Sequence, residues 1–85
     1  MKFELLARKG TKEILYALSE KDGMKFTELK TLVGSPTTAS QRLQELAGAG
    51  VVEREVQADR YRSVKYSLTK KGMQTVKLMK ELDRF

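Results

Sequence analysis

The hydrophobic pattern of this chain changes period abruptly between Gly48 and Gly50. Before that point, apolar residues recur at spacings of three and four, which is typical of amphipathic helices. From Val51 onward they alternate with polar residues, as in strands with one buried face, and after Leu68 the helical period returns. A chain of 85 residues has material for one core, so these segments are expected to pack as a single domain over residues 1–85.

Cysteine and histidine are both absent from the sequence. Thiolate nucleophiles, imidazole bases, zinc fingers, iron–sulfur sites and c-type haem attachment each need one of these side chains. Glu53, Glu55 and Asp59 lie close together in the sequence, but acids at exposed strand positions usually stay solvated. We therefore expect a protein that is not an enzyme and that binds no metal and no other cofactor.

No apolar run reaches the roughly 18–20 residues of a membrane span, and the amino-terminal run MKFELLARKG lacks the apolar stretch of a signal peptide. We expect a cytoplasmic, nucleoid-associated protein without a membrane partner. Seventeen Lys and Arg against eleven Asp and Glu give a formal net charge of +6. This balance favours nucleic acid as a partner over a merely solvated basic surface, and residues 60–71 concentrate the positive charge without any acid.

Glycines and capping residues divide the helical part of the chain. Between about Lys2 and Ser19 the pattern predicts a short helix and a longer one, separated at Gly10, with Thr11 as the cap of the second; a continuous helix kinked at Gly10 is the alternative. An extended link, with the option of a short strand, follows at residues 24–26. The next predicted helix covers residues 28–33, with Thr27 as its cap and with Leu29, Leu32 and Val33 facing inward.

Ser35 and Pro36 mark the start of another helix, because Ser is a strong N-cap and Pro fits the first helical position. This helix is predicted over residues 36–47. Two helices joined by a tight turn at Gly34 form a helix-turn-helix, and a hairpin directly after the second helix makes it winged. The expected fold is therefore mostly α with a β-hairpin (α+β), a winged helix-turn-helix; a three-helix bundle with an incidental hairpin is the alternative.

The alternating segments, residues 51–56 and 62–68, are expected to pair as this hairpin, with Val52 and Val56 on the face that also carries the apolar residues of the second strand. The tip, residues 57–62, is the predicted wing. Its Arg60, Tyr61 and Arg62 suit phosphates or a narrow minor groove. An ordinary solvated turn is the alternative.

The outer face of the helix over residues 36–47 carries uncharged polar side chains. At 100° per residue its apolar residues Ala39, Leu43, Leu46 and Ala47 share one arc, and Gln41 lies opposite that arc. Short hydrogen-bonding side chains suit base edges in a DNA major groove, whereas a solvated helix more often carries Lys and Glu there. The predicted DNA contacts of this region are Ser35, Thr37, Thr38, Ser40, Gln41, Arg42 and Gln44.

Position suggests a role for each of these residues. Ser35, Thr37 and Thr38 lie at the helix N-terminus, where free backbone N–H groups favour a phosphate. Gln41 is the best candidate for base readout, with adenine as the natural partner of its amide, and Arg42 is suited to phosphate or guanine. Glu45, one turn later, is expected to mark the end of the helix that leaves the groove.

Two runs of the sequence carry a resemblance: TELKTLVGSPTTASQRLQELAGAGVVERE and VKYSLTKKG. They resemble the winged helix-turn-helix transcription regulators of bacteria and archaea, of the MarR, ArsR and HxlR kind. The similarity covers residues 24–72, and it implies that the hydroxyl, amide and guanidinium residues between Ser35 and Arg42 fall where such proteins meet DNA. Metal sensing of the ArsR type and thiol sensing of the HxlR type need Cys or His, so neither is expected here.

The last predicted helix, residues 70–84 with Thr69 as its cap, has more apolar surface than its own core needs. Its apolar residues sweep about 240°, whereas packing on one small core takes roughly 100°. They are Met73, Val76, Leu78, Met79, Leu82 and Phe85. The excess predicts a homodimer held by this helix, with help from the first helix, which sets two recognition helices about 34 Å apart. An exposed tail is the alternative.

The leading hypothesis is a sequence-specific regulator of transcription that binds double-stranded DNA, a dimeric repressor reading a palindromic operator. The helix over residues 36–47 would enter the major groove, and the wing over residues 57–62 would meet the backbone or minor groove. Two alternatives belong to other classes: a winged-helix protein-interaction module and a non-specific architectural DNA-binding protein. No motif identifies a small-molecule effector.

Overall fold

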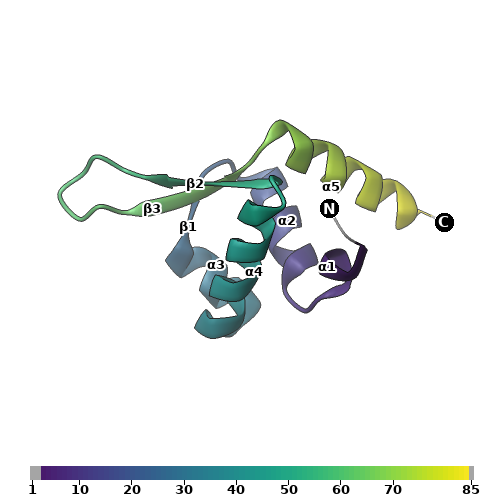
Figure 1. Cartoon of the computed structure of the whole chain (residues 1–85), viewed down its shortest axis with the longest axis horizontal. Helices are drawn as coiled ribbons and strands as arrows, with labels where there is room; N and C mark the ends of the chain where they lie inside the picture. Colours follow the sequence, from purple (N-terminus) through teal and green to yellow (C-terminus); the bar gives the residue numbers. More distant parts are fainter. Residues whose placement is uncertain (1–2, 85) are drawn as a thin grey trace.

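Five helices and three strands form the part of the chain that the structure describes, residues 3–84 of a computed structural model (Figure 1). In chain order they are α1 (Phe3–Ala7), α2 (Thr11–Glu20), β1 (Met24–Lys25), α3 (Phe26–Val33), α4 (Pro36–Gly48), β2 (Val52–Val56), β3 (Val64–Leu68) and α5 (Lys70–Leu82). Helices α3 and α4 form the helix-turn-helix, and the β2–β3 hairpin forms the wing. The predicted fold class is confirmed.

The three strands form one antiparallel sheet in the order β1-β3-β2. Val52 lies opposite Leu68, so the apolar alternation of both hairpin strands falls on one face, as predicted. Met24 of β1 pairs with Tyr66 on the other edge of β3. The extended link predicted at residues 24–26 is therefore a strand over its first two residues, and the third already belongs to α3.

The hydrophobic core lies where α2, α3 and α4 pack against the inner face of the sheet. Its largest fully buried apolar side chains are Ile14, Leu15, Leu29, Leu43, Leu46 and Val51. Ala39, Leu43 and Leu46 form the buried side of α4, which confirms most of the predicted apolar arc. Because this side is fixed against the core, the opposite side of α4 faces outward.

Two of the four predicted helix caps are confirmed. The Ser35 hydroxyl oxygen accepts a hydrogen bond from the Thr38 N–H at 3.3 Å, and the Thr69 hydroxyl oxygen accepts one from the Gly72 N–H at 3.0 Å. These bonds satisfy backbone donors that have no partner inside the first helical turn. They fix the first residues of α4 and α5 at the predicted positions.

The caps predicted at Thr11 and Thr27 are wrong. Gly10 is the N-cap of α2, and the buried Thr11 hydroxyl donates instead to the Leu5 carbonyl at 2.8 Å. Helix α3 begins two residues earlier than predicted, with Lys25 as its N-cap. The Glu28 carboxylate reaches back to accept from the Lys25 N–H at 3.2 Å, so a side chain inside the helix satisfies the exposed backbone donor.

Several predicted inward positions and helix ends also need correction. Leu32 and Ala47 are exposed although the helical pattern placed them with residues that face the core. Helix α4 runs one residue further than predicted, to Gly48, and α5 ends at Leu82 rather than at residue 84. Lys2 and Phe85, predicted to lie in the first helix and to extend the apolar stripe of the last, are outside the described residues.

Helix α5 is tied to α2 near its C-terminal end. The Tyr16 hydroxyl donates to Asp83 Oδ2 at 2.7 Å, and Lys12 Nζ lies 3.2 Å from the same oxygen. The hydrogen bond to Asp83 raises the pKa of Tyr16, while that bond and the Lys12 ammonium lower the pKa of Asp83. These exposed contacts join the C-terminal end of α5 to α2.

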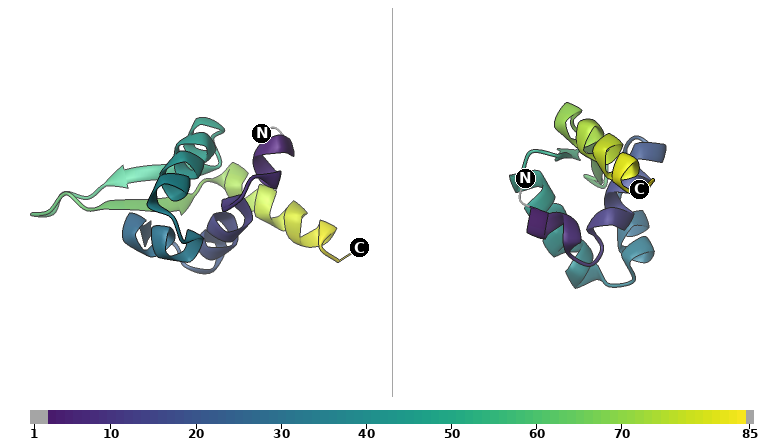
Figure 2. Two further views of the ribbon diagram at one scale, coloured as in Figure 1. Left: turned by 90° about the horizontal axis from the view of Figure 1, so that it is seen from below. Right: turned by 90° about the vertical axis from the view of Figure 1, so that its right-hand side faces the viewer.

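The molecule is elongated, with principal extents of 46 × 25 × 21 Å. The wing and α5 project from opposite ends of the long axis, and α2, α3 and α4 lie between them (Figures 1 and 2). Helix α1 lies on the side of α5, far from the wing tip. Within residues 3–84, no helix combines the length and the apolar character needed to cross a bilayer.

Candidate nucleic-acid interface

The turn between α3 and α4 is tight because Gly34 adopts a left-handed conformation. Its φ is 88°, and its N–H donates to the Lys30 carbonyl at 2.9 Å, which closes α3. Ser35 follows in an extended conformation and caps α4, and Pro36 occupies the first helical position. The first helical turn of α4 contains no acidic residue. Its N-terminus can therefore accept an approaching phosphate without repulsion between charges.

The outer face of α4 presents the predicted polar residues in two groups. Thr37, Gln41 and Gln44 are exposed, while Ser35, Thr38 and Ser40 are half-buried at the borders of the face. Both amides therefore point away from the core, and they lie within one helical turn of each other. The N-terminal turn and the centre of α4 together form an uncharged hydrogen-bonding surface.

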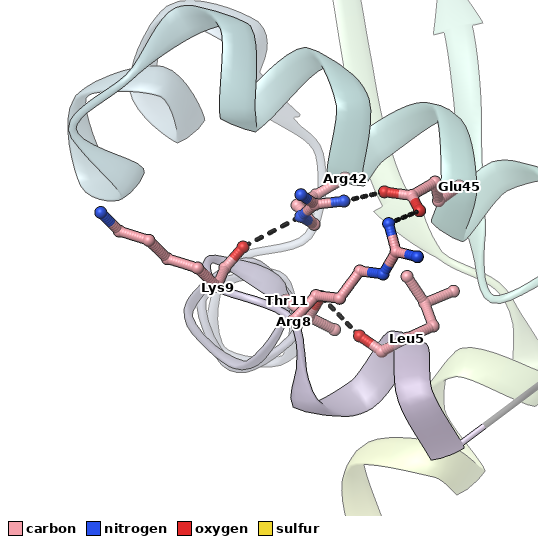
Figure 3. Close-up of polar contacts among 6 residues, drawn as sticks. All are labelled: Leu5, Arg8, Lys9, Thr11, Arg42 and Glu45. Carbon is pink, nitrogen blue, oxygen red and sulfur yellow. Dashed lines mark hydrogen bonds and ion pairs between the residues drawn. The ribbon is translucent and has the colours of Figure 1, made fainter.

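Arg42 does not belong to this outer face. Only 13% of its side chain is exposed; its Nε donates to the Lys9 carbonyl at 3.0 Å, and its Nη1 pairs with Glu45 (Figure 3). The second Glu45 oxygen accepts from Arg8 Nη1 at 2.9 Å. The guanidinium predicted to reach DNA is thus engaged with the turn between α1 and α2, and Glu45 is bound by two arginines.

The wing tip is ordered around a single acid. Asp59 accepts hydrogen bonds from the Tyr61 N–H at 3.2 Å, the Ser63 N–H at 3.0 Å and the Ser63 hydroxyl at 2.8 Å. These bonds, led by the backbone bond from Ser63, lower the pKa of Asp59. Arg60 and Arg62 are exposed, and 82% of Tyr61 is exposed between them. The ordered loop therefore presents the side chains of Arg60, Tyr61 and Arg62 to solvent.

Arg62 has a positive φ of 49°, in the left-handed region that residues other than Gly and Asn seldom adopt. The hydrogen bonds around Asp59 hold it there, and the Gln57 N–H closes the loop by donating to the Ser63 carbonyl at 2.7 Å. A bulky cation at such a position costs conformational energy. Its backbone strain is offset by the ordered turn that carries it.

Arg54 was not among the predicted contacts, although it lies beside them. A hollow of about 390 Å³ lies between α4 and the hairpin, and it is lined by Ser40, Leu43, Gln44, Ala47, Arg54 and Tyr66. Arg54 lies opposite Tyr66 in the hairpin register, so it is on the face of β2 that the strand alternation assigns to the core. An arginine on the otherwise apolar face of β2 is the sequence signal that could have identified Arg54 as a residue of this site.

Among residues 3–84, no group of three or more acids is placed to hold a metal ion. Glu45 pairs with Arg8 and Arg42, and Asp59 orders the wing tip. The exposed Glu53 and Glu55 alternate with Arg54 along β2 and so lie on the other face of that strand. The candidate interface therefore combines uncharged polar groups on α4 with Arg54, Arg60 and Arg62 of the hairpin.

Comparisons with known proteins agree with this arrangement. The HxlR-like helix-turn-helix family model matches residues 5–85. An uncharacterized HTH-type transcriptional regulator of Halalkalibacterium halodurans is 35% identical over 80 residues, which cover 92% of this chain and 71% of that protein. The likeness therefore includes almost the whole chain.

Solved structures give the same result. The reduced form of the transcriptional regulator YodB from B. subtilis has a TM-score of 0.86 at 27% identity, covering 96% of this chain and 81% of YodB. The S. aureus MepR–DNA complex has a TM-score of 0.82 at 19% identity, covering 95% of this chain and 68% of that chain, which is a likeness of fold. The described architecture is thus one already seen in solved structures.

Proposed function

Because the chain belongs to the HxlR-like helix-turn-helix family, we propose that it is a sequence-specific regulator that binds double-stranded DNA and represses transcription by occupying an operator. The observation that carries the proposal is the outer face of α4, where exposed amides and hydroxyls lie on a helix whose other side is fixed in the core. A major groove accepts one α-helix and presents base edges to side chains of this kind.

Gln41 is the proposed base reader, because it is exposed at the centre of the outer face. Thr37 and Thr38, with Ser35, would contact phosphate and the first base from the N-terminus of α4, and Ser40 and Gln44 would flank the reader. A good bidentate contact between an amide and adenine discriminates against other bases by about 1–3 kcal/mol. Specificity in this proposal comes mainly from uncharged groups.

The wing supplies the electrostatic part of the proposal. Arg60 and Arg62, with Tyr61 between them, would reach phosphates or the minor groove next to the base pairs read by α4. Arg54, in the hollow beside Ser40 and Gln44, adds a cation between the wing and the recognition helix. Each phosphate neutralised by such a side chain makes binding more sensitive to salt.

We also propose that residues 1–85 act as one DNA-binding domain that pairs with a second copy through α5. Leu78 and Leu82 are 61% and 63% exposed on one side of α5. Phe3 of α1, 77% exposed, lines a small groove together with Leu82, so the apolar surface continues from α5 onto α1. Burying such a surface stabilises a two-fold pair, which then reads a palindromic operator with half-sites about 34 Å apart.

The proposal includes no thiol switch. YodB is described in a reduced form, but these 85 residues contain no cysteine, so a reaction at sulfur cannot be transferred from it. The proposed repressor acts by occupancy, without a metal or a cofactor.

Selection from random DNA duplexes, repeated at two salt concentrations, tests the proposal. An enriched motif with two related half-sites is the expected result. Salt-sensitive binding without a motif would support an architectural DNA-binding protein instead, because phosphate contacts alone carry no sequence information. Absence of binding at both salt concentrations would favour a winged helix that contacts another protein.

A further inference from the structure

We propose that Arg8, Arg42 and Glu45 form a latch that fixes α4 against the turn between α1 and α2, and that Arg42 is a positioning residue for DNA recognition. In this view Arg42 acts by holding the recognition helix and does not touch the DNA. The inference rests on the proposed DNA-binding function and goes beyond it by assigning a role to three charged residues away from the outer face of α4.

The latch uses both oxygens of one carboxylate (Figure 3). Glu45 accepts from Arg42 through Oε1 and from Arg8 through Oε2, the latter at 2.9 Å. Arg42 donates a further hydrogen bond, from Nε to the Lys9 carbonyl at 3.0 Å. Two side chains of α4 are therefore connected to two consecutive residues of the α1–α2 turn.

The turn that receives the latch is itself held in place. The buried Thr11 hydroxyl donates to the Leu5 carbonyl at 2.8 Å, and the Thr11 N–H donates to the Arg8 carbonyl at 3.2 Å. These bonds link the end of α1 to the start of α2. Because these bonds hold the backbone of the α1–α2 turn in place, the contacts of Arg42 and Glu45 with that turn restrain the position of α4.

Releasing Arg42 toward a phosphate is costly. Its side chain is 13% exposed, against 52% for Arg8 and 33% for Glu45, so it is the most enclosed member of the latch. Moving it out would leave the Lys9 carbonyl without this donor and remove one of the two cations beside Glu45. Groups left unpaired in a partly buried site lose more free energy than a surface ion pair gains.

The latch also controls where the proposed reader points. Gln41 precedes Arg42 directly, so a rotation of α4 about its axis would turn both side chains together. Fixing Arg42 to the Lys9 carbonyl therefore helps to fix the direction in which the Gln41 side chain leaves α4. Setting this direction before binding favours recognition of a base edge, because ordering a mobile group on binding reduces affinity.

Glu45→Gln separates the latch from simple electrostatics. The substitution removes a negative charge from α4, so charge alone predicts tighter binding to any duplex. We expect instead that the ratio of affinities for the selected duplex and a scrambled duplex falls about tenfold. Glu53→Gln removes the same charge from an exposed position on β2 and is expected to keep the ratio. Equal ratios for the two variants would overturn the latch.

Salt dependence separates a positioning role from a phosphate contact. Arg42→Ala and Arg42→Lys are expected to reduce the affinity ratio while the slope of log K against log salt stays near the parent value. If Arg42→Ala lowers the magnitude of that slope by about 0.9, as expected when one phosphate is no longer neutralised, Arg42 touches DNA and the proposal is wrong. Circular dichroism of each variant checks that the fold is retained.

The free protein gives a readout that needs no DNA. Solvent exchange of the Arg42 Nε–H, followed by NMR, is expected to be slow in the parent and at least several-fold faster in Glu45→Gln; equal rates would overturn the latch. A parent that binds no duplex would overturn the proposed function, together with the DNA role of Arg42. The exchange measurement would then still decide whether the latch exists.

Discussion

The Cα of Gly72 packs so closely on the carbonyl oxygen of Val51 that a Cβ at this position would lie well inside van der Waals distance of that oxygen. The same oxygen accepts from the Thr69 N–H at 3.1 Å, and the Thr69 hydroxyl donates to the Gly50 carbonyl at 2.6 Å. The first turn of α5 therefore contacts the backbone that joins α4 to β2.

Gly72→Ala is expected to lower the free energy of unfolding by about 2–3 kcal/mol, because the backbone of Val51 must move to admit a methyl group. Gly48→Ala is the matched control, since it adds the same group to a helical position with open space around it. That control is expected to be stabilising by about 0.5–1 kcal/mol. Urea denaturation of both variants provides the measurement. Equal effects would show that the contact at Gly72 is not tight in solution.

The wing arginines are expected to set part of the salt dependence of DNA binding. Arg60→Gln with Arg62→Asn should reduce the magnitude of the slope of log K against log salt by up to about 1.8, or about 0.9 for each phosphate that is no longer neutralised. Asn is chosen at position 62 because it tolerates the positive φ there. Lys77→Gln with Lys80→Gln removes the same charge from α5 as a control. A slope that falls equally in both would mean that the wing makes no specific phosphate contact.

Gln41→Ala is expected to change sequence preference more than non-specific affinity, because its side chain is exposed and uncharged. The affinity for the preferred duplex should fall by about 1–3 kcal/mol, with little change on a scrambled duplex. Gln74→Ala removes an exposed amide from α5 and serves as the control. If duplexes selected by the parent and by Gln41→Ala share one motif, Gln41 is not the reader.

The apolar side of α5 is expected to hold the dimer. Leu78→Glu with Leu82→Glu should convert the parent dimer to a folded monomer at micromolar concentration, because two carboxylates would be buried at the seam without partners. Met73→Glu replaces an exposed apolar residue that the helical period places on a different side of α5, and it should remain a dimer. Sedimentation velocity distinguishes the states. A monomeric parent, or a double variant that stays dimeric, would exclude this seam.

The wing tip is expected to lose order in acid. Hydrogen bonds to the Asp59 carboxylate, led by the backbone bond from Ser63, lower its pKa. The order that they provide is therefore present above the pKa of an unperturbed aspartate, and it is lost as the pH falls through the lowered pKa of Asp59. Exchange protection of the Ser63 N–H reports this change. Asp59→Asn should keep protection that no longer depends on pH in this range, while Asp59→Ala should lose it at neutral pH. A parent whose Ser63 N–H is no better protected at neutral pH than that of Asp59→Ala would contradict the assignment.

Local signals predicted most of the fold. Ser35 before Pro36 predicted the cap of α4, and Thr69 before the last helical pattern predicted the cap of α5; both caps are present. Strand alternation predicted which residues of the hairpin share a face, because a shift by one residue would move the apolar side chains to the other face. Thr11 and Thr27 carry the same hydroxyl, but their helices begin earlier because neighbouring backbone and side-chain bonds decide the boundary.

The sequence predicted which residues of α4 are exposed at the centre of its outer face, but it did not predict the contacts of residues at the edges of that face. Helical geometry identified Gln41 and Thr37 as exposed. At 100° per residue Arg42 falls between Gln41 and the apolar arc, where the direction of a long side chain depends on the groups that lie beside it. That neighbour is the Lys9 carbonyl, 33 residues away in the sequence, and no local pattern contains this contact.

The placement of the wing and α5 at opposite ends of a 46 Å molecule has a consequence for the length of DNA that a pair joined through α5 would protect. The wing tips become the outermost points of the assembly, so the protected region is limited to about 90 Å, or roughly 27 base pairs. Inserting about five base pairs between half-sites turns them to opposite sides of the duplex. A rigid pair could then occupy only one of them, so operator spacing would be constrained as tightly as operator sequence.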